Sequence, residues 1–157
     1  MSEYLTVSAE QGEPEIFSTI QGEGRHLGEP ATFIRLSGCN LQCIWCDTPY
    51  TWNWTGTNFE HNGDQKFVKE NEQITLAVGE AVNRITGKTA ERVVITGGEP
   101  LIQQTNIVEL VKQLKEANPN IRVEIETNGS IAPTNALQEQ IDQFNVSVKL
   151  RNSTMPE

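Results

Sequence analysis

Along this chain, segments with the apolar spacing of a helix alternate with short apolar runs typical of a strand. Over residues 73–86 the apolar side chains are spaced by four, four and three, which is typical of one face of a helix. Residues 92–96 are instead a β-branched run that indicates a buried strand. Strands that alternate with helices form parallel sheets with helical crossover connections. The pattern therefore predicts an α/β fold, with any ligand site at the C-terminal ends of the strands.

The expected elements occur in the order strand, long loop, helix, strand, helix, strand, helix, strand. Residues 1–30, rich in Glu, Gly and Ser, predict an irregular lead-in with room for one short strand. The expected strands cover residues 31–36, 92–96, 121–126 and 144–150. The expected helices cover residues 73–86, 107–114 and 134–141, and a loop covers residues 50–70. These elements are too few for a closed eight-stranded barrel, so we expect a partial, open (β/α) barrel.

Length and charge limit the kind of protein that this sequence can encode. The 157 residues are enough for one domain with its own core, so we expect residues 1–157 to form a single domain. The 12 basic and 21 acidic residues leave a net charge of −9, which disfavours general binding to nucleic acid. We find no apolar run that could span a membrane and no secretory signal. We therefore expect a cytoplasmic protein.

Three cysteines lie close together directly after the strand expected over residues 31–36. Cys39, Cys43 and Cys46 have the spacing C-x3-C-x2-C. Three thiolates from one loop can hold three corners of a [4Fe–4S] cluster, which normally takes four cysteines, so one iron would stay open for a small chelating ligand. There are two alternatives. The three cysteines could bind zinc together with His26 or His61, or they could be buried thiols without a chemical role.

The segment Gly38-Cys39-Asn40-Leu41-Gln42-Cys43-Ile44-Trp45-Cys46-Asp47 resembles the signature of radical SAM enzymes, down to the aromatic residue before the last cysteine. Residues 96–100, Thr-Gly-Gly-Glu-Pro, resemble the GGEP motif that binds the amino group of S-adenosylmethionine (SAM) in that superfamily; read alone, they could form only a tight turn. The resemblance implies a [4Fe–4S] cluster that reduces SAM and releases methionine and a 5′-deoxyadenosyl radical.

Three further segments narrow the resemblance. Residues 17–24 (FSTIQGEG), 33–36 (FIRL) and 46–52 (CDTPYTW) together resemble the 7-carboxy-7-deazaguanine synthases (QueE) of queuosine biosynthesis, over residues 14 to about 153. This implies a lyase that converts 6-carboxy-5,6,7,8-tetrahydropterin into 7-carboxy-7-deazaguanine with release of ammonia, and that uses Mg²⁺ as well as SAM. It also implies a homodimer, a reductant such as flavodoxin or ferredoxin, and no direct contact with nucleic acid or membrane.

The resemblance also implies a role for individual residues. Arg35 would bind the substrate carboxylate, which a guanidinium fork suits, and Thr48 would bind Mg²⁺ beside Asp47. The implied substrate-binding residues are Ile20, Gln21, Gly22, Glu23, Arg35, Thr96 and Glu126. The implied cofactor-binding residues are Trp45, Asp47, Gly97, Gly98, Glu99, Asn128, Ser147, Val148 and Lys149. No protein side chain is implied as catalytic, because the radical comes from SAM. Without the resemblance, Arg35 would be read as a surface arginine, residues 20–23 as a solvated turn and Thr48 as part of a Thr-Pro turn.

Two departures from the family are expected to matter. Val148 stands where the family has the proline of a Ser-Pro-Lys element, and family members continue beyond Glu157 with a further strand, a helix and a tail. A small glycyl-radical activating enzyme is the alternative function, because such enzymes share the Gly-Cys-Asn-Leu-x-Cys pattern. A metal-binding module without enzyme activity is a third.

Overall fold

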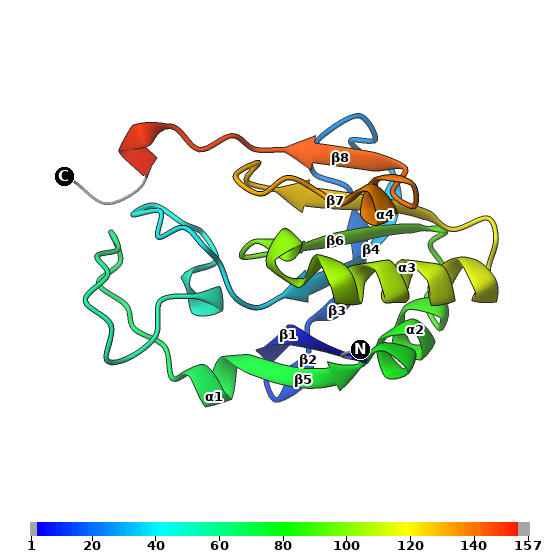
Figure 1. The fold of residues 1–157 in the computed structure, drawn as a ribbon. Coiled ribbons are helices and arrows are strands. Elements are labelled where there is room, and N and C mark those ends of the chain that lie inside the picture. Colours follow the sequence, from blue (N-terminus) through cyan, green and yellow to red (C-terminus); the bar gives the residue numbers. More distant parts are fainter. Residues whose placement is uncertain (1–2, 154–157) are drawn as a thin grey trace.

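A mixed sheet runs through the part of the chain that the computed structural model describes, residues 3–153 (Figure 1). Its eight strands are β1 (Tyr4–Glu10), β2 (Glu13–Pro14), β3 (Ile16–Ile20), β4 (Pro30–Leu36), β5 (Gln73–Ala77), β6 (Arg92–Gly97), β7 (Arg122–Thr127) and β8 (Gln143–Val146). The helices are α1 (Lys69–Glu72), α2 (Val78–Thr86), α3 (Gln104–Ala117) and α4 (Asn135–Gln138). Short 3₁₀ turns cover Pro49–Thr51, Pro100–Gln103 and Arg151–Ser153.

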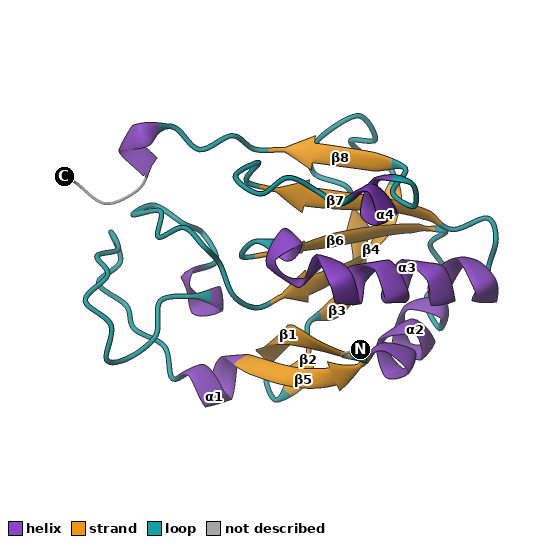
Figure 2. Ribbon diagram, in the orientation of Figure 1, coloured by secondary structure: helices purple, strands orange, loops and turns teal. Residues whose placement is uncertain are grey.

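The parallel half of the sheet confirms the expected alternation. Strands β4, β6, β7 and β8 lie side by side in that order and are parallel. Figure 2 shows helices α2 and α3 on one face of these strands, and the sheet stays open rather than closing on itself. The C-terminal ends of the four strands share one edge, and the loop that carries the cysteines leaves β4 there. The prediction of a partial, open barrel is confirmed.

The expectation of an irregular lead-in over residues 1–30 is wrong. Strand β1 pairs antiparallel with β5 over five register positions and touches β4 at one, Val7 with Leu36. Strand β3 forms an antiparallel hairpin with β4. The sequence signal in β1 is weak but present, because buried Leu5, Val7 and Ala9 alternate with polar residues, as expected for a strand with one face on the core. Small and polar neighbours obscured this period.

The helix expected over residues 73–86 is wrong at its start, since residues 73–77 form β5. The spacing of Ile74, Val78 and Val82 fits a helix equally well, but pairing with β1 satisfies the backbone hydrogen bonds of residues 73–77 instead.

Three other expected elements differ from the structure only in their bounds. The helix expected over 134–141 is only α4, and the strand expected over 144–150 runs from residue 143 to residue 146. The loop over residues 50–70 is confirmed apart from Pro49–Thr51 and the start of α1.

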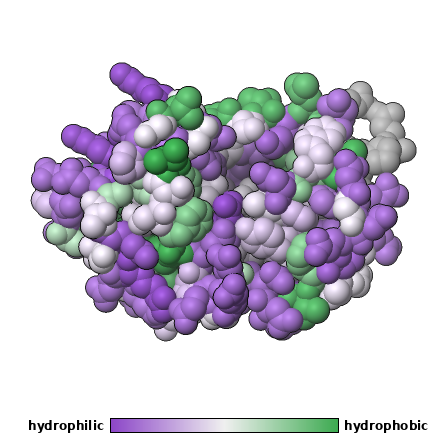
Figure 3. All heavy atoms as spheres, turned by 180° about the vertical axis from the view of Figure 1, so that it is seen from behind, coloured by the Kyte–Doolittle hydropathy of each residue, from purple (hydrophilic) through white to green (hydrophobic). Residues whose placement is uncertain are grey.

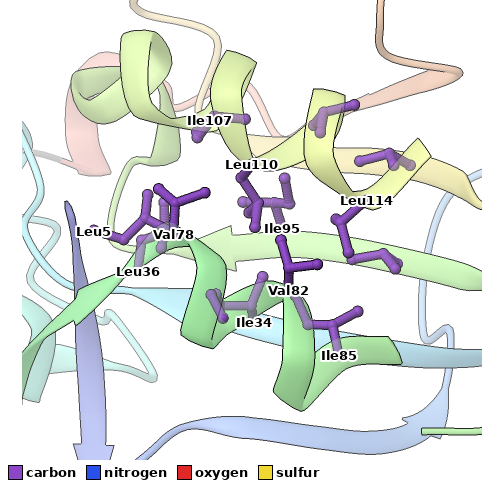
Figure 4. Close-up of a cluster of buried hydrophobic side chains, with 14 of the residues drawn as sticks. Leu5, Ile34, Leu36, Val78, Val82, Ile85, Ile95, Ile107, Leu110 and Leu114 are labelled. Atoms are coloured by element: carbon purple, nitrogen blue, oxygen red, sulfur yellow. The ribbon is translucent and has the colours of Figure 1, made fainter. Parts of the chain in front are cut away.

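The main core lies between the sheet and helices α2 and α3 (Figure 4). Strand residues such as Ile34 and Ile95 meet helix residues such as Val82 and Leu110, and all four are almost fully buried. Burial of each such side chain contributes about 1.5–3 kcal/mol. The other face of the sheet has a smaller apolar cluster, in which Phe17 stacks on Phe33 with ring centroids 5.4 Å apart.

The face of the molecule seen from behind is mostly hydrophilic, with apolar residues in separate patches (Figure 3). No helix in residues 3–153 is both long and apolar enough to cross a membrane.

Candidate active site

The cysteine loop, defined here as residues 38–48, lies directly against the end of β6. The backbone N–H of Glu99 donates to the carbonyl of Gly38 at 2.9 Å. A side chain at position 98 would place its Cβ 2.2 Å from the Gly38 carbonyl oxygen and 2.9 Å from the Cβ of Cys39. Only glycine at position 98 leaves room for this approach. The sequence motif of two glycines therefore allows the cysteine loop to pack on the strand end.

All three cysteines are free thiols, with Cys43 buried and Cys39 and Cys46 partly exposed. Burial raises the pKa of the Cys39 thiol to about 11, and the charges of Glu99, Cys46 and Cys43 act in the same direction. The set of three thiols on one loop without helix or strand suits an iron–sulfur cluster. Within residues 3–153 no three Cys, His, Asp or Glu side chains already converge on a metal position, so the thiols must turn toward a common centre when they bind one.

A pocket of about 270 Å³ lies beside the cysteine loop at the C-terminal edge of the sheet. It collects residues from β4, β6 and β7 and from the segment after β8. The residues that line it are Glu23, Arg35, Asp47, Thr48, Thr96, Gly97, Gly98, Glu126, Thr127, Asn128, Ser147 and Lys149. Eleven of the seventeen residues that the sequence resemblance assigned to substrate, SAM or Mg²⁺ therefore lie around one cavity.

The charges in this pocket have both signs. Burial raises the pKa of Glu23, the charge of Glu126 raises it further, and the charge of Lys149 partly offsets both. Lys149 donates from Nζ to the hydroxyl of Ser147 at 2.7 Å. Within the cysteine loop, the hydroxyl of Thr48 lies 3.6 Å from the sulfur of Cys46. Carboxylates and hydroxyls gathered in this way can hold an ammonium group or a hard cation such as Mg²⁺.

Glu99 does not line the pocket. Its side chain is fully buried, and its carboxylate accepts hydrogen bonds from the Thr127 hydroxyl at 2.9 and 3.0 Å, the Asn128 N–H at 2.8 Å and the Leu101 N–H at 2.9 Å. The structure thus places Glu99 behind the pocket, where it holds the end of β7 against the start of the turn Pro100–Gln103.

Five other residues assigned from the sequence also lie outside the pocket lining. Ile20 ends β3 with an exposed side chain, and Trp45 and Val148 are exposed as well. Gly22 has open space around it. Gln21 is also outside the pocket, but it is buried: its amide donates to Glu124 at 3.2 Å and accepts from the backbone N–H of Glu23 at 3.1 Å.

Glu124 is the centre of a buried polar network on the face of the sheet away from the helices. Its fully buried carboxylate accepts from Arg92 and from Asn145 at 3.0 Å, besides Gln21, and the Nδ1 of His26 lies 2.6 Å from it. Burial alone would raise the pKa of Glu124, but the hydrogen bonds from Asn145 and Gln21 and the charge of Arg92 outweigh it and hold the pKa below its usual value. The network pins the loop that carries Gln21 and Glu23 to the sheet.

Sequence reasoning did not identify Glu124 or Glu15. Glu124 alternates with apolar residues in β7 and therefore reads as a solvent-facing position. Glu15 contacts Arg35: the Arg35 Nε donates to a Glu15 carboxylate oxygen at 2.7 Å. Each glutamate pairs with an arginine that is distant in the sequence, Arg92 for Glu124 and Arg35 for Glu15, and no local pattern in the sequence indicates these pairs.

Comparisons with known proteins agree with this geometry. A sequence profile of the radical SAM superfamily matches residues 33–150, three quarters of the chain, and the chain belongs to that superfamily. Within it, the chain is similar to proteins named 7-carboxy-7-deazaguanine synthase. The one from Pyrobaculum aerophilum is 38% identical over 88% of this chain and 55% of its own length, and the one from Buchnera aphidicola is 41% identical over 74% and 53%.

The same likeness holds in three dimensions. The crystal structure of QueE from Escherichia coli superposes with a TM-score of 0.65 and 30% sequence identity, covering 94% of this chain and 61% of that one. The resemblance drawn from the sequence motifs is confirmed. The chain spans about half the length of the curated relatives it matches.

Proposed function

We propose that this chain carries the active site of a 7-carboxy-7-deazaguanine synthase, a lyase that converts 6-carboxy-5,6,7,8-tetrahydropterin into 7-carboxy-7-deazaguanine and ammonia. The observation that carries the proposal is the pocket of about 270 Å³ at the C-terminal edge of the sheet, lined by Arg35, Thr48, Gly98 and Lys149 among others. The similarity to proteins of that name supports it, and it favours this reading over a glycyl-radical activating enzyme.

Cys39, Cys43 and Cys46 would hold the [4Fe–4S] cluster that membership of the radical SAM superfamily implies. When bound, the cluster and SAM supply the one-electron chemistry that removes a hydrogen atom from carbon 6 of the substrate. Gly97 and Gly98 line the pocket at the end of β6, where their backbone groups would contact SAM. Asn128, Ser147 and Lys149 offer polar contacts in the same pocket.

The substrate is an anion that enters a protein of net charge −9, so its carboxylate needs local positive charge. Arg35 supplies that charge within the pocket. Thr48 and Asp47 would place Mg²⁺ on the same carboxylate, because their oxygens suit a hard cation that also keeps substrate and water ligands. Glu23 and Glu126 can accept hydrogen bonds from the N–H groups of the pterin ring.

The remaining parts of the proposal concern the setting of the enzyme. We place residues 1–157 in one radical SAM domain of a cytoplasmic homodimer that receives electrons from flavodoxin or ferredoxin. The product would enter 7-deazapurine synthesis on the route to queuosine.

Anaerobic reconstitution tests the proposal. The chain should take up about four irons and show the brown absorption of a [4Fe–4S] cluster, and Cys43→Ala should lose both. The loaded chain should then bind 6-carboxytetrahydropterin and, with SAM, Mg²⁺ and a reductant, release 7-carboxy-7-deazaguanine and ammonia. Full iron content in Cys43→Ala would contradict the cluster assignment. A loaded chain with no affinity for the carboxypterin would contradict the substrate assignment.

A further inference from the structure

Arg35 lies between two cavities. Its side chain lines the pocket beside the cysteine loop, whereas its partner Glu15 lines a second cavity of about 300 Å³ together with Glu10, Tyr50 and other residues. No residue is shared between the two sets of lining residues. Glu15 therefore contacts Arg35 from outside the pocket.

Glu15 holds Arg35 at two points. The Arg35 Nε donates to a Glu15 carboxylate oxygen at 2.7 Å, and the Arg35 backbone N–H donates to the Glu15 carbonyl at 3.1 Å. The hydroxyl of Tyr50 donates to both Glu15 carboxylate oxygens, at 3.3 and 3.1 Å. The side chains of Arg35 and Glu15 are 19% and 10% exposed, so solvent screens their ion pair only in part.

This pairing determines which edge of the guanidinium faces the pocket. A guanidinium can grip a carboxylate in a fork either with Nε and one terminal nitrogen or with the two terminal nitrogens. Glu15 occupies Nε. The terminal nitrogens donate no hydrogen bond to another residue in the described part of the chain. The two-nitrogen end of Arg35 is thus the edge left for an anion in the pocket.

Glu15 contributes orientation rather than attraction. Burial would lower the pKa of Arg35, but the hydrogen bond and charge of Glu15 outweigh it, so the guanidinium stays ionised. A negative partner nevertheless reduces the positive field that a substrate anion meets. The benefit of the pair is that a long side chain is already fixed in one rotamer before the substrate arrives, so less entropy is lost on binding.

We propose that Glu15, held by Tyr50, is a positioning residue that presents the two terminal nitrogens of Arg35 to the carboxylate of the substrate. The inference rests on the proposed function, because it requires that the ligand of the pocket carries a carboxylate.

A double-mutant cycle on substrate affinity tests the coupling. We expect Glu15→Ala to raise the dissociation constant of 6-carboxytetrahydropterin about tenfold and Arg35→Ala about a hundredfold. The double variant should bind no worse than Arg35→Ala, because Glu15 acts only through Arg35. Glu15→Gln should restore most of the affinity, since its carbonyl can still accept from Nε. Glu10→Ala, in the same cavity without contact to Arg35, is the matched control. Losses that add in the double variant would overturn the inference.

A second measurement needs no substrate. Hydrogen exchange of the Arg35 Nε–H, followed by NMR, should be slow in the parent chain and in Glu10→Ala and at least about tenfold faster in Glu15→Ala. Tyr50→Phe should show an intermediate rate. Equal exchange in the parent chain and Glu15→Ala would overturn the inference. If the parent chain binds no carboxypterin, the proposed function fails, and the exchange rates still decide whether Glu15 positions Arg35.

Discussion

At the scale of single residues, Glu124 has the most demanding environment, because its carboxylate is fully buried among donors from several segments. Glu124→Gln would turn an amide N–H₂ toward the N–H groups of Arg92, Gln21 and Asn145 that now donate to the carboxylate. Arg92 would then be left without its buried partner, and we expect a loss of about 3–5 kcal/mol in the free energy of unfolding. Denaturant titration measures the loss. Glu116→Gln on the exposed side of α3 is the control and should change stability by less than about 0.5 kcal/mol.

The pH dependence of stability gives a separate prediction for Glu124. Its pKa lies below the usual value in the folded protein, so the unfolded chain takes up the proton first as pH falls. The stabilising contribution is therefore complete above about pH 4.3 and is lost below it. The stability advantage of the parent chain over Glu124→Gln should be constant between about pH 5 and 7 and shrink on further acidification. An advantage that grew below pH 4 would contradict the lowered pKa.

At the scale of elements, the contact between the end of β6 and the cysteine loop depends on the absence of a side chain at position 98. Gly98→Ala should push the Gly38 carbonyl away, cost about 1–3 kcal/mol in stability and reduce iron uptake on reconstitution. Thermal unfolding and iron analysis measure the two effects.

Gly79→Ala is the matched control for that prediction. Gly79 lies in α2, where an added Cβ meets only the Gln113 side chain at 3.9 Å. Alanine should stabilise this helix by roughly 0.5–1 kcal/mol without a change in iron uptake. Normal iron content and stability in Gly98→Ala would show that the loop does not need this close approach.

Sequence patterns predicted the helices and strands that have a strong apolar period within their own segment. Strands β4, β6 and β7 and helix α3 follow from strong apolar periods in adjacent residues. Strands β1 and β5 stabilise each other from residues about seventy positions apart, and neither has a period strong enough to predict it alone. The short helical spacing around Ile74 therefore misled the prediction for residues 73–77.

The candidate site was predictable to a similar degree. Residues at strand ends, such as Arg35, Thr96 and Glu126, line the pocket as the parallel topology requires. The sequence could not tell that Glu99 and Gln21 are saturated by hydrogen bonds within the protein, since their partners lie 28 and 103 positions away. Such contacts depend on the whole fold and leave no local pattern.

At the scale of the whole molecule, cluster binding should couple to stability. The three thiols do not converge on a metal position by themselves, so a cluster that joins them would cross-link the loop after β4. We expect the reconstituted chain to melt about 5 °C or more above the iron-free chain under anaerobic conditions. Cys43→Ala, treated identically, should have the same melting temperature with and without iron. An equal melting temperature for fully loaded and iron-free parent chain would contradict the assignment.

The two faces of the sheet also bear on how this protein can change over evolutionary time. Apolar residues such as Ile34, Ile95 and Ile125 face α2 and α3, whereas Arg35, Thr96 and Glu126 line the pocket from the neighbouring positions of the same strands. Successive side chains of a strand point to opposite faces, so neighbouring codons are under different kinds of selection. A saturation mutagenesis scan read once by abundance and once by activity should split β4, β6 and β7 into two interleaved sets. New ligand preferences could then arise at every second position while the scaffold is inherited unchanged.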